Sequence, residues 1–361
     1  MVVGHCGGSS WIVSFIYAFH MPAFFFITGF LTDFSKGRSL SFAVRKFINL
    51  LVPFFFLTFF LLSVKAILAT IPGYQSPFGW QDVSYGDALR LLFTRGDVYS
   101  QPLGTFWFLP CMFFSLLILR LLVVACHCHR GLVFLFSSAV AILGFYLLSI
   151  DYQPFIWILR PKQVFIAQYM MCLGWLVRKS VLREKYLNLK HPVVCVTTFL
   201  ISLGILLYLS LHDHYRLSVS RMIFPSPTWM FVISSLSGSM MVLSLSVLIS
   251  AIPFGWIKAP FIYLGKGSLS VMIFHFLGIK LFGLFLVGVG YFQYTEIFSV
   301  VPPDTTLGIL RVAYVVVSIA FSLGLYEGLK RIPVVGDLCG FRNKIANKAG
   351  GLCDAIMDKI S

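Results

Sequence analysis

The chain has 361 residues, of which 58% are hydrophobic and 11% are charged. Soluble globular domains carry roughly 25% charged residues, and a soluble core of this size cannot bury so much apolar surface. The composition therefore predicts a protein that lies in lipid. The formal net charge is +15, but the basic residues stand in short connections between apolar runs. That distribution is typical of membrane-protein loops and argues against nucleic acid as a partner.

Nine segments are long and apolar enough to be read as membrane-spanning helices, which need about 20 mostly apolar residues. They predict an all-α fold, a polytopic transmembrane helix bundle. A single transmembrane domain is expected over residues 1–330, followed by a basic cytoplasmic tail over 331–361. The predicted spans are 11–32, 48–70, 104–125, 132–150, 163–178, 193–211, 229–251, 264–289 and 309–327.

Lys and Arg are concentrated in alternate connections, beginning with 33–47 and including 178–190 and the C-terminal tail. The positive-inside rule makes these connections cytoplasmic, so the N-terminus is expected outside and the C-terminus inside. No cleavable signal peptide is visible. Met1 to His5 resemble the outer end of a helix whose beginning is missing, so we expect a truncated first helix of a ten-helix parent. The alternative is a natural nine-helix protein with a short external N-terminus.

The connection at 71–103 is long and rich in Gly, Pro and aromatic residues, including Trp80. Loops of this length are usually functional or disordered. Its aromatic rings suit contact with the C–H faces of sugars. The alternative is an aromatic belt at the lipid headgroups.

A compact run, Cys126-His127-Cys128-His129, offers metal-ligating side chains but lacks the spacing of a zinc site. We interpret it as an ordinary interfacial loop and expect no bound metal. The remaining cysteines show no disulfide framework, because several lie in or beside apolar runs, where Cys behaves as a small hydrophobic residue.

His5 stands among Gly4, Gly7 and Gly8, where the backbone can approach a ligand or another helix closely. Its imidazole is a natural general base for deprotonating a hydroxyl, because the pKa of histidine is near neutral. The alternative is an interfacial histidine without a catalytic role.

Two further histidines fall inside predicted spans, where ionisable residues are costly and become candidates for function. His20 precedes Pro22, which removes a helical hydrogen bond and predicts a kink. His20 either lines a polar cavity or simply binds the carbonyl that the proline frees. His275 lies in mid-span and is expected at the same cavity. Lys65 and Lys280 lie near the outer ends of their spans and are expected to extend toward the headgroups.

The stretch FHMPAFFFITGF at 19–30 resembles a signature of the acyltransferase-3 family, and most closely its branch of fucose 4-O-acetylase-like enzymes. Similar segments follow in the same order along nearly the whole chain. They are Arg45-Lys46 with Leu51-Val52-Pro53, Trp107-Phe108-Leu109, residues 168–179, and residues 264–269 followed by His275.

The resemblance implies ten membrane helices and the use of cytoplasmic acetyl-CoA to acetylate a sugar. The acceptor would belong to a cell-surface polysaccharide or its lipid-linked precursor, and the location would be the bacterial inner membrane. The family's hallmark is a basic residue ten positions before a histidine in the first helix. His5 matches the histidine of that pattern, and the basic residue would precede Met1.

The predicted mechanism is direct acyl transfer without a bound cofactor, and acetyl-CoA is the donor substrate. His5 and His20 are the predicted catalytic residues, with His5 as base. His275, Trp107 and Ser268 are predicted to bind the acceptor. Arg45 and Lys46 are predicted to meet the donor's phosphates, although the positive-inside rule already explains their charge. Two alternatives are a transporter or flippase for a lipid-linked or small anionic solute and an inactive remnant.

Overall fold

The structure is a computed structural model that describes residues 2–7, 10–68, 70, 86, 105–152, 157–182, 191–211, 217–219, 222–225, 228–298, 302 and 308–360. Within these ranges the regular structure is helical, apart from an isolated β-bridge between Ser218 and Ile223. The all-α fold class is thereby confirmed. The predicted loop 71–103 lies outside the described residues, except for Gly86, and so does the side chain of Lys65.

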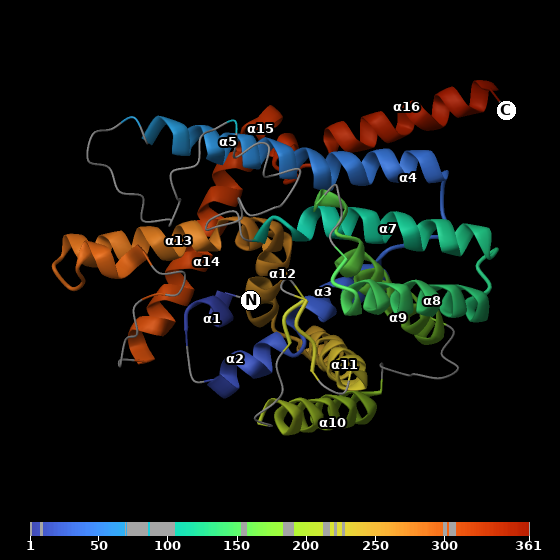
Figure 1. Cartoon of the computed structure of the whole chain (residues 1–361), viewed down its shortest axis with the longest axis horizontal. Helices are drawn as coiled ribbons and strands as arrows, with labels where there is room; N and C mark the ends of the chain where they lie inside the picture. The colour runs from blue at the N-terminus through green and yellow to red at the C-terminus, as the bar shows by residue number, and fades with distance from the viewer. Residues whose placement is uncertain are drawn as a thin grey trace.

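The helices pack side by side as a bundle (Figure 1). The long helices are α2 (Ser10–Tyr17), α3 (His20–Leu31), α4 (Ser39–Lys46), α5 (Val52–Leu68), α7 (Phe108–Ala125), α8 (Arg130–Ser149), α9 (Pro161–Leu182), α10 (Pro192–Ser210), α11 (Trp229–Ala251), α12 (Gly255–Lys266), α13 (Ser268–Gly288), α14 (Gly308–Arg331) and α16 (Lys344–Ile360). The shorter elements are α1 (Val2–His5), η1 (Phe47–Leu51), η3 (Trp157–Leu159), η4 (Tyr294–Phe298) and α15 (Pro333–Leu338).

Among the described residues, eight helices are long and apolar enough to cross a membrane. They include α2 with α3 as one span, Trp11–Leu31, and α4 with η1 and α5 as another, Ser39–Val64. All eight correspond to predicted spans. The ninth, at 163–178, forms helix α9, which is less apolar than the others. Because α9 packs against α3, α7 and α8 in the interior, it accommodates polar side chains such as the buried Gln168.

The first predicted span breaks close to Pro22, as its sequence predicts. Helix α2 ends at Tyr17 and α3 begins at His20, so Ala18 and Phe19 form the break. Pro22 consequently falls in the first turn of α3, where a backbone N–H would have no helical partner. The break places Tyr17 and His20 at adjoining helix ends.

Helices α3 and α9 touch through their backbones at two glycines. A Cβ atom on Gly29 would lie 1.9 Å from the carbonyl oxygen of Met171, and one on Gly174 would lie 1.9 Å from that of Phe26. Small residues at a crossing let membrane helices approach closely. This crossing holds the His20-bearing helix against the centre of the bundle.

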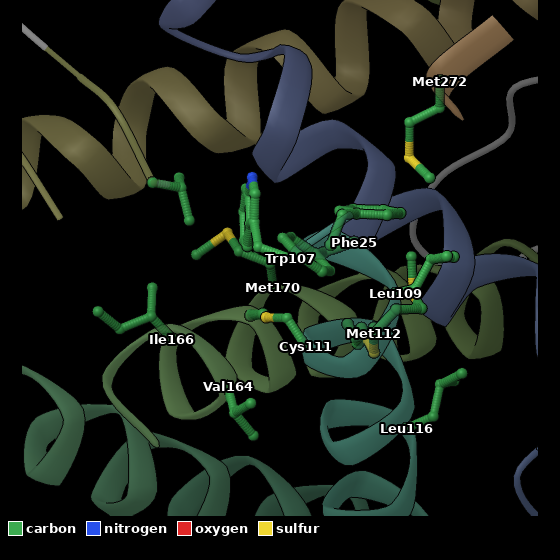
Figure 2. Close-up of a cluster of buried hydrophobic side chains, with 14 of the residues drawn as sticks. Phe25, Trp107, Leu109, Cys111, Met112, Leu116, Val164, Ile166, Met170 and Met272 are labelled. Carbon is green, nitrogen blue, oxygen red and sulfur yellow. The ribbon is translucent and has the colours of Figure 1, made fainter. Parts of the chain in front are cut away.

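The main hydrophobic core forms where α7 and α9 meet α3. Figure 2 shows Phe25 of α3 beside Trp107, Leu109 and Met112 at the start of α7, with Met170 of α9 next to them. All five side chains are buried. These side chains pack the middle of α3 against α7 and α9.

The C-terminal part of the chain shows two features that the sequence did not predict. Helix α13 begins at Ser268, and the residues before it form a separate helix, α12, so the segment predicted at 264–289 is divided. The predicted tail contains two helices, α15 and α16. Helix α16 runs alongside α4 (Figure 1).

Candidate functional site

Three histidines lie close together: His5 and His20 both contact Tyr17, and His275 lies beside His5. His5 ends α1, His20 begins α3, and His275 lies in the middle of α13. The ring centroid of Tyr17 is 6.1 Å from that of His5 and 4.9 Å from that of His20. The His5 and His275 centroids are 5.2 Å apart. The structure thus brings together the three histidines that the sequence singles out, and we call these four residues the histidine cluster.

His5 is the most accessible of the three histidines, being half-buried. Its ring lies 4.7 Å from that of Phe276, and its Nδ1 is 3.5 Å from the Tyr17 hydroxyl. Gly4 makes this approach possible, because a Cβ atom there would lie 3.0 Å from the Tyr17 ring. The glycine beside His5 therefore serves the close packing of α1 on α2.

His20 is 8% exposed, and its Nδ1 lies 2.9 Å from the carbonyl oxygen of Ile16. A carbonyl only accepts, so Nδ1 carries the proton of the neutral ring and Nε2 keeps a lone pair. The Tyr17 ring stands almost perpendicular to the His20 ring, at 88°. His20 is held by a backbone carbonyl at the helix break and also belongs to the histidine cluster.

His275 is fully buried, and its Nδ1 lies within hydrogen-bonding distance of the carbonyls of Val271 and Met272. Nδ1 is therefore the protonated nitrogen of the neutral ring. Its Nε2 has no hydrogen-bond partner among the described residues. Buried polar atoms are normally paired, so an unpaired acceptor nitrogen beside His5 is suited to receive a ligand's hydroxyl group.

Helix α13 is fixed against α14, which sets the position of His275. A Cβ atom on Gly278 would lie 2.8 Å from the Cα of Ser318, so the two backbones are in close contact. The buried Ser270 donates a hydrogen bond to the carbonyl of Ser322 at 2.7 Å. Both contacts lie within two turns of His275 and hold its helix in register.

Trp107 and Ser268, the other predicted acceptor-binding residues, occupy different surroundings. Trp107 is buried at the start of α7, with the Arg160 guanidinium 5.2 Å from its ring centroid. Ser268 is the half-buried first residue of α13, about 10 Å along the helix axis from His275. Among the described residues, Trp107 packs in the main hydrophobic core, and no ring contact joins it to the histidine cluster.

The predicted donor-binding residues lie near the start of the second span. Arg45 donates a hydrogen bond to a carboxylate oxygen of Asp354 in α16 at 3.2 Å. Lys46 places its ammonium group 5.6 Å from the centroid of the Phe42 ring. A further cation, Arg38, pairs with Asp358 at 2.7 Å.

The parts of the chain that the structure describes contain no group of three or more His, Cys, Asp and Glu side chains able to hold a metal ion. Cys126 to His129 form the tight turn between α7 and α8, with positive φ at His127 and Cys128. The His129 ring accepts a hydrogen bond from the Leu132 amide and so caps α8.

Tyr17 is the residue of the histidine cluster that sequence reasoning missed. It stands three positions before His20, but the break at Ala18 and Phe19 determines how the two rings meet. In a chain with 38 Phe and 15 Tyr residues, one more aromatic residue gives no distinctive signal. The sequence signal that could have identified Tyr17 is its polar hydroxyl group within an otherwise apolar span.

The apolar helices define an integral membrane protein, and its interior carries ionisable side chains. The family model for the acyltransferase domain of the acyltransferase-3 type matches residues 1–327, so the chain belongs to that family. No curated protein and no solved structure shows significant similarity to the chain. The fucose 4-O-acetylase-like branch stays a prediction.

Proposed function

We propose that this protein transfers an acetyl group from acetyl-CoA to a sugar hydroxyl. The acceptor is a cell-surface polysaccharide or its lipid-linked precursor, and the location is the bacterial cytoplasmic membrane, with the C-terminus in the cytoplasm. The observation that carries the proposal is the histidine cluster within a chain of the acyltransferase family.

The reaction needs a group that removes the proton of the attacking hydroxyl. As the sugar oxygen attacks the thioester carbonyl, the new C–O bond forms and the C–S bond breaks. The sulfur of coenzyme A leaves as a thiolate and is then protonated. We assign the base to His5, because it is the most accessible histidine of the cluster and imidazole titrates near neutral pH. The imidazolium that results supplies the proton for the thiolate.

His20 and His275 have a different role in this scheme. Both rings donate Nδ1–H to backbone carbonyls, so their Nε2 atoms are acceptors in the neutral state. An acceptor orients a hydroxyl group but does not stabilise an oxyanion. Of the two roles open to these rings, orienting the acceptor hydroxyl or stabilising the developing oxyanion, this supports the first.

The test is the transfer of radiolabelled acetyl from acetyl-CoA to glycan in membranes that contain the full chain. His5→Ala is expected to lower the rate by about 10²–10⁴-fold, the usual contribution of a general base. His191→Ala is the matched control, because His191 is an exposed histidine at the start of α10. Equal rates in the His5→Ala variant and the unmodified protein would remove His5 from the mechanism.

A second outcome separates the enzyme from a transporter. Movement of a lipid-linked sugar across the bilayer without any acetyl-CoA-dependent labelling would contradict acetyl transfer and favour a flippase. Labelling of the glycan excludes a protein whose role is transport alone.

A further inference from the structure

Helix α16 lies antiparallel along α4 (Figure 1). The residues of α16 that face α4 recur every four positions, as one face of a helix requires: Ala346, Gly350, Asp354 and Asp358. Ala346 and Gly350 are buried. A Cβ atom on Gly350 would lie 2.1 Å from Nε of Arg45, so the missing side chain makes room for the guanidinium group. The family match ends at residue 327, before this helix.

The two acidic residues of this face bind three polar groups of the α4 segment. Asp354 accepts hydrogen bonds from the Ser41 hydroxyl at 2.6 Å and from Arg45 at 3.2 Å. Arg38 pairs with Asp358 at 2.7 Å and also donates to the backbone carbonyl of Asp354 at 2.8 Å. One turn of α16 therefore covers two guanidinium groups and a hydroxyl.

Two guanidinium groups beside a hydroxyl form an anion-binding arrangement. Arginine matches the geometry of carboxylate and phosphate oxygens alike, and charge-assisted hydrogen bonds to phosphate are strong. The carboxylates of Asp354 and Asp358 occupy the positions that phosphate oxygens would take. The same set includes Arg45, which the sequence predicts to meet the phosphates of the donor.

The ion pairs between α16 and α4 are partly exposed to water, so a competing anion can replace the carboxylates of α16. The side chains of Arg45 and Asp354 are 44% and 37% exposed, and that of Asp358 is 70% exposed, so water weakens both ion pairs. On its other face α16 exposes the apolar residues Ile345, Leu352 and Ile356. An amphipathic helix of this kind stays at a membrane surface after it leaves a protein partner.

We propose that α16 is a reversible cover that competes with the phosphate groups of the acyl donor for Arg38, Ser41 and Arg45. When a phosphate-bearing donor binds, its oxygens replace the two carboxylates and α16 separates from α4. The identity of the donor rests on the proposed function, whereas the competition with phosphate groups rests on the contacts of α16.

The first test is kinetic. The double variant Asp354→Asn/Asp358→Asn keeps the full chain and the shape of α16 but removes the competing charges. We expect its KM for acetyl-CoA to fall about three- to tenfold with kcat unchanged. Asp151→Asn is the matched control, because Asp151 is an exposed carboxylate that pairs with Lys162 beyond the end of α8. An unchanged or higher KM in the double variant would overturn the proposal.

The second test requires no catalysis. Cys353 follows Ala346 by seven residues and so lies on the covered face of α16. Of the other cysteines, Cys128 is exposed and the rest are buried, so a Cys128→Ser background makes Cys353 the accessible thiol. Adenosine 3′,5′-bisphosphate, the thiol-free nucleotide part of coenzyme A, is expected to speed maleimide labelling of Cys353 several-fold. Adenosine, which has no phosphate, is expected to have no effect.

The outcomes separate this inference from the proposed function. Faster labelling with the bisphosphate supports the cover even where no acetyl transfer is detected. If the protein transfers acetyl groups but the bisphosphate does not change the labelling rate of Cys353, the cover is refuted and the proposed enzymatic function stands. Labelling that responds to anionic phospholipid in nanodiscs, and not to the nucleotide, would assign the site to lipid headgroups and overturn the donor's role.

Discussion

The imidazole rings of His5 and His275 lie 5.2 Å apart, although 269 positions separate them in the chain. Phe276 packs against both rings, with centroids 4.7 Å from His5 and 4.5 Å from His275. This packing of Phe276 against both imidazoles helps to hold them in place. In the proposed reaction, an acceptor hydroxyl group beside the two rings would meet the unpaired Nε2 of His275.

Replacing His275 tests whether that nitrogen orients the acceptor. His275→Leu keeps an apolar side chain of comparable size within α13 but removes the lone pair. We expect acetyl transfer to fall by about 10–100-fold, because one positioned hydrogen bond at the reacting hydroxyl is lost. The rate of labelled acetyl incorporation is the measurement, with His191→Leu as control. A rate within twofold of the unmodified protein would show that His275 is a packing residue.

Tyr17→Phe removes only the hydroxyl group that lies 3.5 Å from Nδ1 of His5. The ring, with its contact to His20, is retained, so the fold should not change. We expect kcat to fall about tenfold and the KM for acetyl-CoA to remain constant, because Tyr17 acts on the orientation of His5 and not on the donor. Tyr146→Phe on the exposed face of α8 is the control. A change in donor KM alone would contradict this role.

Sequence reasoning located the individual histidines but not the way they meet. The stretch 19–30 carries a recognisable motif, and Pro22 indicates the helix break, so His20 could be placed at a helix end. His5 and His275 meet because α1 packs near α13 and α14. No periodicity within one helix encodes such a contact. The role of Tyr17 depends on that same packing.

Helix α9 and the C-terminal tail show the same limit of sequence reasoning. Helix α9 was identified from its apolar residues even though it carries buried glutamines, because enough hydrophobic side chains remain. The tail was identified only as basic. The four-residue spacing of Ala346, Gly350, Asp354 and Asp358 predicts one helix face, but its partner α4 lies about 300 residues earlier. Sequence spacing reveals a face and leaves its partner undetermined.

Gly174→Ala tests the backbone contact between α3 and α9. The new methyl group would lie 1.9 Å from the Phe26 carbonyl oxygen, so the helices must separate. Overpacking of this kind typically costs about 1–3 kcal/mol of unfolding free energy. Gly204→Ala in α10 is the matched control, since nothing lies within 4 Å of its added Cβ and alanine favours helix by about 1 kcal/mol. Thermal unfolding in detergent should therefore show opposite shifts, and equal shifts would refute the close crossing.

Arg120 clamps the turn between α3 and α4. It is 3% exposed, and its guanidinium donates to the backbone carbonyls of Phe34, Lys36 and Gly37. Arg120→Met keeps an unbranched apolar side chain in place of the aliphatic part of Arg120 but removes the guanidinium donor to these carbonyls. Hydrogen bonds to a charged group contribute about 1.5–3 kcal/mol each, and their partial replacement by water lowers the net loss, so we expect about 3 kcal/mol less unfolding free energy. Thermal unfolding in detergent is the measurement.

Two variants make the Arg120 result specific. Arg120→Lys keeps the charge but lacks the planar fork that reaches several carbonyls at once, so its loss should be intermediate. Arg130→Met removes a single bond to the Lys179 carbonyl and should cost least. Because the same turn leads into α4, which carries Arg45, loosening it should also raise the KM for acetyl-CoA. Arg120→Met protein with unchanged stability would show that the turn is held by its own backbone, independently of this arginine.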